Sequence, residues 1–170
     1  MRLLRAFIVV GLATLALYAP ASTLAAQTYS DTISGYEYFA TSSDGKFAGS
    51  AAGALPGAWN ADVQHTPLCV SCTPTATITG GSFSLATTLN SIPALVTGVF
   101  SGGTVQVIDV GAGCTNQSFA VNGILGNVGP WYSGSGSGTF SATLTHYRRP
   151  IFGRCITYAA SVTGTLALNF

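Results

Sequence analysis

Residues 139–170 read TFSATLTHYRRPIFGRCITYAASVTGTLALNF, and this stretch decides the fold. Two runs of alternating apolar and polar residues flank a short connection that contains Pro and Gly, a pattern typical of a β-hairpin. One face of the first run is apolar up to its last two members, His146 and Arg148. The second run keeps an apolar face over residues 156–170, interrupted only at Gly164. The pattern therefore predicts two half-buried antiparallel strands.

The same alternation recurs along the chain, most clearly at Trp59, Ala61 and Val63, whereas no apolar series of helical period follows residue 26. Strands are expected at residues 27–42, 47–55, 59–66, 75–89, 94–101, 104–110, 117–128, 139–148 and 156–170, with a two-residue turn at Gly102 and Gly103. Eight or nine strands in sequential hairpins predict an all-β domain. We expect a small antiparallel β-barrel, and the alternative is a two-sheet β-sandwich.

Glycines and phenylalanines recur together in a way that suits a strongly coiled sheet. Gly80 and Gly81 indicate a bulge or a sharp bend inside a strand. The phrase Gly-x-Phe-Ser occurs three times and contains Phe83, Phe100 and Phe140. We interpret it as a repeated structural motif, in which Gly permits a bend of the strand and the following Phe fills the core.

The N-terminal region, residues 1–26, has the pattern of a cleavable signal peptide. Arg2 and Arg5 precede an apolar run over residues 6–18, and small residues follow at Ala25 and Ala26. The apolar run is shorter than the roughly 20 residues that span a bilayer, so no transmembrane helix is expected in the mature chain. The prediction is a single secreted domain over residues 27–170.

Charged residues are scarce, at 6% of the chain, so the surface must be covered by uncharged polar residues, which suits an extracellular protein. Removing Arg2 and Arg5 leaves four of the six basic residues against five acids, and 4 − 5 gives a net charge of −1. A chain of that charge has no general attraction to nucleic acid or to anionic membranes, so no nucleic-acid partner is predicted.

Four cysteines in an exported chain indicate two disulfides, for which three pairings exist. The short separation of Cys69 and Cys72 favours their pairing, which leaves Cys114 with Cys155. An alternative for the first pair is a zinc site with His65, because His-x3-Cys-x2-Cys is a metal-ligand spacing. The disulfides are preferred because export favours oxidised cysteines, and no metal or other cofactor is predicted.

Basic and aromatic side chains converge on the hairpin of residues 139–170. In a barrel, the alternation would place His146 and Arg148 near the mouth, with Tyr158 close by. The candidate binding residues are His146, Arg148, Arg149, Arg154 and Tyr158. Such a group could bind a small anionic ligand through charge-assisted hydrogen bonds. The alternative is that the arginines only cover an exposed hairpin tip.

No nucleophile elbow, phosphate-binding loop or zinc-protease motif occurs, so no catalytic residue is assigned. The predicted role is non-enzymatic, either structural or in binding a small anionic ligand or an extracellular surface partner. One alternative is an enzyme of unknown reaction, which His65, His146 and an acid within hydrogen-bond reach in one pocket would indicate. Another is an outer-membrane protein, because the last strand resembles the closing strand of bacterial outer-membrane barrels in its alternation and its terminal Phe170.

Overall fold

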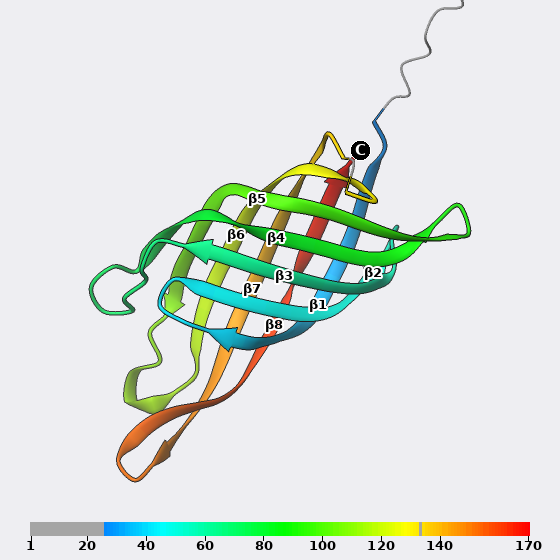
Figure 1. Ribbon diagram of the computed structural model, residues 1–170. Helices are drawn as coiled ribbons and strands as arrows, with labels where there is room; N and C mark the ends of the chain where they lie inside the picture. Colours follow the sequence, from blue (N-terminus) through cyan, green and yellow to red (C-terminus); the bar gives the residue numbers. More distant parts are fainter. Residues whose placement is uncertain (1–25, 133) are drawn as a thin grey trace, which may run out of the picture.

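The computed structural model describes residues 26–132 and 134–170, and the predicted signal peptide lies almost entirely outside them. Eight antiparallel strands form a closed barrel in which each strand pairs with its neighbours in sequence and β8 returns to β1 (Figure 1). The strands are β1 (Thr28–Ala40), β2 (Asp44–Gly53), β3 (Gly57–His65), β4 (Thr75–Leu89), β5 (Ile92–Asp109), β6 (Gln117–Pro130), β7 (Gly136–Ile151) and β8 (Arg154–Asn169), with one 3-10 turn, η1 (Ala112–Cys114), before β6. The predicted all-β barrel is confirmed.

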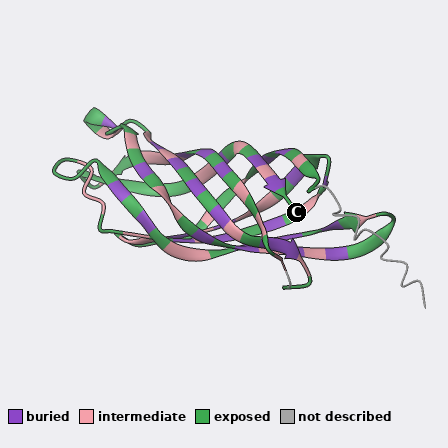
Figure 2. Cartoon of the chain, turned by 90° about the horizontal axis from the view of Figure 1, so that it is seen from above, coloured by how far each residue is buried: buried purple, intermediate pink, exposed green. Residues whose placement is uncertain are grey.

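Buried and exposed residues alternate along the strands, as the sequence pattern predicted (Figure 2). The middle of the barrel is filled by aromatic side chains. Trp59 and Phe100 each pack edge-on against Phe140, with ring centroids 5.6 Å and 5.9 Å apart. Phe83, Phe100 and Phe140 are all buried, so the core role predicted for the repeated phenylalanines is confirmed. Gly123 makes room for one of them, because a Cβ there would lie 2.4 Å from the Phe100 ring.

The outward-facing side chains are mostly small and polar. At one level of the barrel Asn122, Ser141, Thr165 and Thr32 follow one another on neighbouring strands, and all four are exposed. The Ser141 hydroxyl donates a hydrogen bond of 2.8 Å to Asn122 Oδ1, and the Thr32 hydroxyl donates one of 3.1 Å to the Ala52 carbonyl. The barrel is therefore apolar inside and rich in hydroxyl groups outside at this level.

The two-residue turn predicted at Gly102 and Gly103 is wrong. β5 continues through both glycines, and the β5–β6 register shifts between Phe100 and Gly102, where the strand forms a bulge. Gly103 has a φ of 125°, which a residue with a side chain rarely adopts. The expected segments 94–101 and 104–110 are therefore one strand, β5, and the nine expected segments become eight strands.

The two ends of the barrel differ, and we call them the terminal end and the mouth. At the terminal end the backbones of Gln27 and Phe170 exchange two hydrogen bonds, of 3.0 Å and 3.2 Å, and the Tyr29 and Phe170 rings stack. The mouth carries the connections of residues 41–43, 66–74, 110–116 and 152–153. Both disulfides lie there.

The barrel wall is interrupted near the mouth between β1 and β8. Their ladder runs from the Thr28–Asn169 pair to the Gly35–Val162 pair and ends there. β7 and β8, in contrast, stay paired as far as Ile151 and Arg154. Beyond Gly35, β1 and β8 diverge and leave a hollow lined by residues 37–40 and 157–160.

Candidate functional site

A cavity of about 200 Å³ opens at the mouth, above the aromatic side chains that fill the middle of the barrel. Its apolar lining consists chiefly of Phe47, Val63, Leu68, Val70, Val105, Phe119, Val121 and Leu144. The lining also includes polar residues, among them Glu37, Asp44, His65, Gln117 and His146. A mostly apolar cavity with few polar groups is the usual form of a small-molecule site.

Glu37 and His146 form the central polar feature of the cavity. The Glu37 Oε2 and His146 Nε2 atoms are 2.6 Å apart, and the two side chains are only 8% and 18% exposed. The His146 ring also packs against Phe119, with centroids 5.0 Å apart. Glu37 comes from β1 and His146 from β7, and β8 lies between these two strands in the barrel. Their hydrogen bond therefore spans β8 on the inner side of the wall, where β1 and β8 have diverged. It links the two sides of the gap in the wall.

Two other polar side chains of the cavity are hydrogen-bonded to the backbone of the mouth. His65 Nδ1 lies 2.8 Å from the Thr66 carbonyl oxygen, and the Gln117 amide donates a hydrogen bond of 3.0 Å to the Val110 carbonyl. Both histidines therefore line one cavity, but the acid Glu37 bonds to only one of them. Glu37 and Asp44 line the same cavity as both histidines. An enzyme would be indicated by both histidines within hydrogen-bond reach of an acid, and the structure joins His146 to Glu37 but His65 to the Thr66 carbonyl.

The disulfides form the pairing that the sequence favoured, Cys69 with Cys72 and Cys114 with Cys155. The alternative zinc site of His65, Cys69 and Cys72 is not formed, because the two sulfur atoms bond to each other. Within the described residues, no three His, Cys, Asp or Glu side chains come together in a way that could hold a metal ion.

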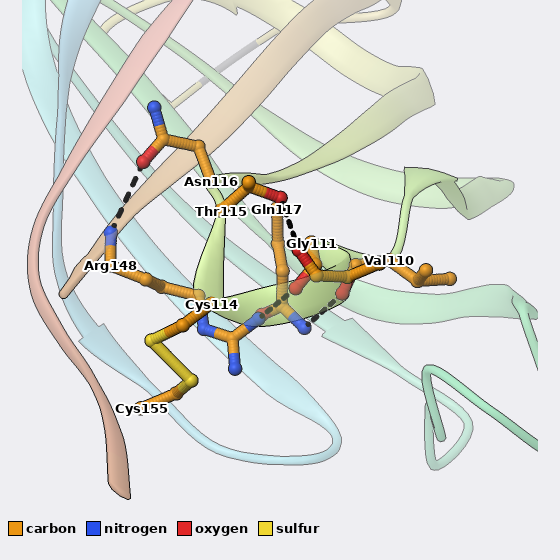
Figure 3. The surroundings of a disulfide bond; sticks show 9 residues. Val110, Gly111, Cys114, Thr115, Asn116, Gln117, Arg148 and Cys155 are labelled. Carbon is orange, nitrogen blue, oxygen red and sulfur yellow. Dashed lines mark hydrogen bonds between the residues drawn. A yellow bond between two sulfur atoms is a disulfide. The ribbon is translucent and has the colours of Figure 1, made fainter. Parts of the chain in front are cut away.

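Arg148 supports the loop of residues 110–116 and does not face the cavity. Its Nη1 donates a hydrogen bond of 3.2 Å to the Gly111 carbonyl, and its backbone N–H donates one of 3.2 Å to Asn116 Oδ1. Figure 3 shows the guanidinium beneath the loop, next to the disulfide from Cys114 to Cys155. Arg148 and the disulfide thus hold the same loop to the β7–β8 hairpin.

The five candidate residues predicted from the sequence do not meet at one point. His146 and Tyr158 both line the hollow between β1 and β8, but of the five only His146 lines the mouth cavity. The Arg149 guanidinium lies over the Tyr158 ring at 5.1 Å, and Arg154 is exposed at the hairpin tip. The separation begins at the irregularity between Tyr147 and Arg148, where the β7–β8 register shifts and the simple alternation ends.

Glu37 was missed as a site residue, although the sequence carries a signal for it. Alternation through the first strand puts Ile33, Gly35 and Glu37 on one face, and an acid on an inward face is uncommon. The strand shows this face to be inward, with Ile33 buried. The partner of Glu37 is 109 residues away, however, and no local pattern connects them.

A second charged group lies on the barrel wall, near the start of β2. Lys46 Nζ and Asp62 Oδ2 are 2.7 Å apart. Burial, followed by the hydrogen bond and the negative charge of Asp62, raises the pKa of the Asp44 carboxyl above its ordinary value of 3.8. The hydrogen bond to Asp62 likewise raises the pKa of Lys46. Asp44 also lines the mouth cavity, whereas Lys46 and Asp62 border a hollow on the barrel wall that includes Asn60 and Ser82.

Fold and site together define a class of protein, a small β-barrel with sequential strands, two disulfides and a cavity at one end. Comparison with protein-family models, curated proteins and solved structures found no match. Among the described residues, no helix has the length and apolar character needed to cross a membrane.

Proposed function

We propose that this protein is an exported binding protein that takes a small, largely apolar molecule into the mouth cavity. Glu37 and His146 hold the polar group of that molecule. The observation that carries the proposal is the buried carboxylate–imidazole pair, 2.6 Å apart, in a cavity whose other walls are mostly apolar. Apolar walls provide affinity, and a few convergent polar groups fix the orientation of the ligand.

The size and charge of the cavity limit the ligand. An apolar cavity of about 150 Å³ accommodates benzene, so the cavity of about 200 Å³ suits a molecule of one or two rings. The carboxylate of Glu37 accepts hydrogen bonds and repels anions. Since Arg148, Arg149 and Arg154 are directed elsewhere, a neutral ligand with a hydroxyl or amine donor fits better than the small anion suggested by the sequence.

Two observations support secretion. Disulfides persist in oxidising compartments, which agrees with the predicted signal peptide. The outward face of the wall is rich in exposed Thr, Ser and Asn, as at Thr32, Asn122 and Ser141, whereas an outer-membrane barrel needs an apolar band on that face. The polar wall thus favours a secreted protein over the outer-membrane alternative.

Titration with two matched probes tests the proposed site. 2-Naphthol and naphthalene have nearly the same shape, but only 2-naphthol can donate a hydrogen bond to Glu37. We expect saturable binding of 2-naphthol at one site, and binding of naphthalene that is weaker by about tenfold, since a hydrogen bond to a charged group contributes about 1.5 kcal/mol. Intrinsic naphthol fluorescence and calorimetry measure the two affinities.

Substitutions on one strand separate the cavity from the rest of the surface. Val105 lines the cavity and Val99 of the same strand is exposed, so Val105→Phe should abolish naphthol binding and Val99→Phe should leave it unchanged. Glu37→Gln should reduce the preference for naphthol over naphthalene. Thermal unfolding establishes that each variant is folded. Naphthol binding that survives in a folded Val105→Phe variant would exclude the mouth cavity as the site.

A further inference from the structure

The β7–β8 hairpin ends in an apolar and basic tip, which we define as Arg149, Ile151, Phe152 and Arg154. The hairpin reaches beyond the other connections at the mouth (Figure 1). Phe152 is 101% exposed, and Ile156 beside the tip is exposed as well. The large side chain of Phe152 therefore has no packing role in the barrel.

The turn that carries Phe152 uses a backbone conformation that its residue type disfavours. Phe152 has a φ of 49° and Gly153 a φ of 71°, both in the left-handed region. Asn and Gly are common in such two-residue turns, and the β4–β5 turn has Asn90 and Ser91. A bulky residue with positive φ is an outlier that commonly marks a functional position. Phe152 gains no packing within the barrel that would offset this backbone strain. We therefore interpret its exposed side chain as a contact for a partner outside the barrel.

The charges around Phe152 have one sign. Arg149 pairs with Ile156 and Ile151 pairs with Arg154, so these four side chains share one face of the hairpin. The opposite face carries Arg148 and Cys155, which hold the loop of residues 110–116. Residues 139–170 contain no Asp or Glu. The exposed face is therefore positively charged without a compensating acid in the hairpin.

We propose that the tip docks on an anionic phospholipid bilayer, with Phe152 in the interface and Arg149 and Arg154 at the level of the lipid phosphates. A bilayer surface accepts a single apolar side chain flanked by basic residues. A stable protein interface buries about 800 Å² on each partner, and four residues at a tip supply much less. A nucleic-acid site would not need the exposed Phe152. Docking would turn the mouth toward the membrane, and it does not depend on the ligand of the cavity.

Vesicle binding tests the proposal. The exported protein, with its first residue established by mass spectrometry, is sedimented with vesicles of phosphatidylcholine alone or with about 30% phosphatidylglycerol. We expect binding to the anionic vesicles that weakens as salt is raised. Each arginine contributes about fivefold to partitioning onto an anionic surface, so the double variant Arg149→Ser, Arg154→Ser should bind about 25-fold less. Phe152→Ser should bind about tenfold less, even at low salt.

The terminal end provides matched controls. Trp131 and Tyr132 are also exposed aromatic residues with positive φ, of 57° and 64°, but no arginine lies beside them in sequence. Replacing both with Ser should leave vesicle binding unchanged, as should Lys46→Ser on the wall. All these positions are exposed or partly exposed, and thermal unfolding should confirm that the variants fold. Equal binding of the wild type and the tip variants would overturn the proposal, as would competition by inorganic phosphate at constant ionic strength.

Discussion

Inward-facing acids have different roles at the two ends of the barrel, structural at the terminal end and ligand-facing at the mouth. Asp31 and Glu37 are six residues apart on β1, and both are acids directed inward. At the terminal end Asp31 is 2% exposed, and its Oδ1 accepts a hydrogen bond of 2.8 Å from the Leu55 N–H. At the mouth Glu37 faces the cavity and bonds to His146. The role of an inward acid therefore depends on its surroundings. In the packed interior Asp31 accepts a backbone hydrogen bond, whereas at the open cavity Glu37 is available to a ligand.

The two ends also differ in what holds them together. Backbone hydrogen bonds between Gln27 and Phe170 close the terminal end, where the chain termini meet. Two of the mouth connections, residues 66–74 and 110–116, are longer than those at the terminal end, and the disulfides and Arg148 hold them in place. Longer connections lose more conformational entropy on folding, so the covalent links occur where that loss is greatest.

The largest expected effect concerns the disulfides at the mouth. Cys114 and Cys155 are 41 residues apart, and loop-closure entropy predicts that replacing both with Ser lowers the free energy of unfolding by about 4 kcal/mol. Cys69 and Cys72 are only 3 residues apart, so their replacement should lower it by about 2 kcal/mol. Urea unfolding of both double variants measures the difference. A larger loss for the shorter loop would show that loop closure does not explain the stabilisation.

The next largest effect is expected from replacing the two inward acids, Asp31 and Glu37, with Ala. Asp31→Ala leaves the buried Leu55 N–H without its acceptor and should lower the free energy of unfolding by about 1–3 kcal/mol. Glu37→Ala should have a smaller effect on stability, because water can enter the open cavity and solvate His146, but it should abolish the preference for 2-naphthol over naphthalene. Chemical denaturation and probe titration of both variants measure the two effects. The assigned roles would be reversed if Asp31→Ala alone changed the preference.

Arg148 and Arg149 form a matched pair for the supporting role at the mouth. Arg148→Met removes a hydrogen bond from a charged donor to the Gly111 carbonyl and should lower the free energy of unfolding by about 1 kcal/mol. It should also expose the loop of residues 110–116 to proteases. Arg149→Met, on the exposed face, should change neither property. Equal protease sensitivity of the two variants would contradict the supporting role of Arg148.

The smallest effect is expected at Asp44, which lines the mouth cavity. Because the pKa of Asp44 is raised in the folded protein, the folded state binds this proton more tightly than the unfolded state does. The group therefore makes the protein less stable as pH rises above its ordinary pKa of 3.8, and the full penalty applies at neutral pH. Asp44→Asn should stabilise the protein at pH 7 by less than about 1 kcal/mol, since the carboxyl is partly exposed. The gain should disappear below about pH 3, which unfolding curves at several pH values can show.

Much of the fold follows from local patterns in the sequence. Alternation identified the inward faces of the strands, and the repeated Gly-x-Phe-Ser phrase identified three core phenylalanines. The turn at Gly102 and Gly103 was wrong because paired glycines suit a bulge as well as a turn. Only the pairing of β5 with β6 distinguishes the two, since it carries the strand through both glycines.

The candidate site was harder to predict, because its central contact joins distant strands. The sequence indicated His146 as an inward residue near one end, but His146 and Glu37 are 109 positions apart in sequence, and no local pattern predicts their contact. The arginines follow His146 closely in sequence, and this proximity suggested a common site. The register shift between Tyr147 and Arg148 separates them in space.

The sequence by itself determined an all-β chain with alternating faces, a favoured pairing of its cysteines and a basic hairpin, because each of these depends on residue types at short spacing. Only the tertiary structure decided that the barrel closes with eight strands and keeps a cavity at its mouth. It alone brought Glu37 to His146 and directed Arg149 and Arg154 outward. The physical reason is that strand register and barrel closure bring together residues far apart in the chain, and no short stretch of sequence specifies their distances.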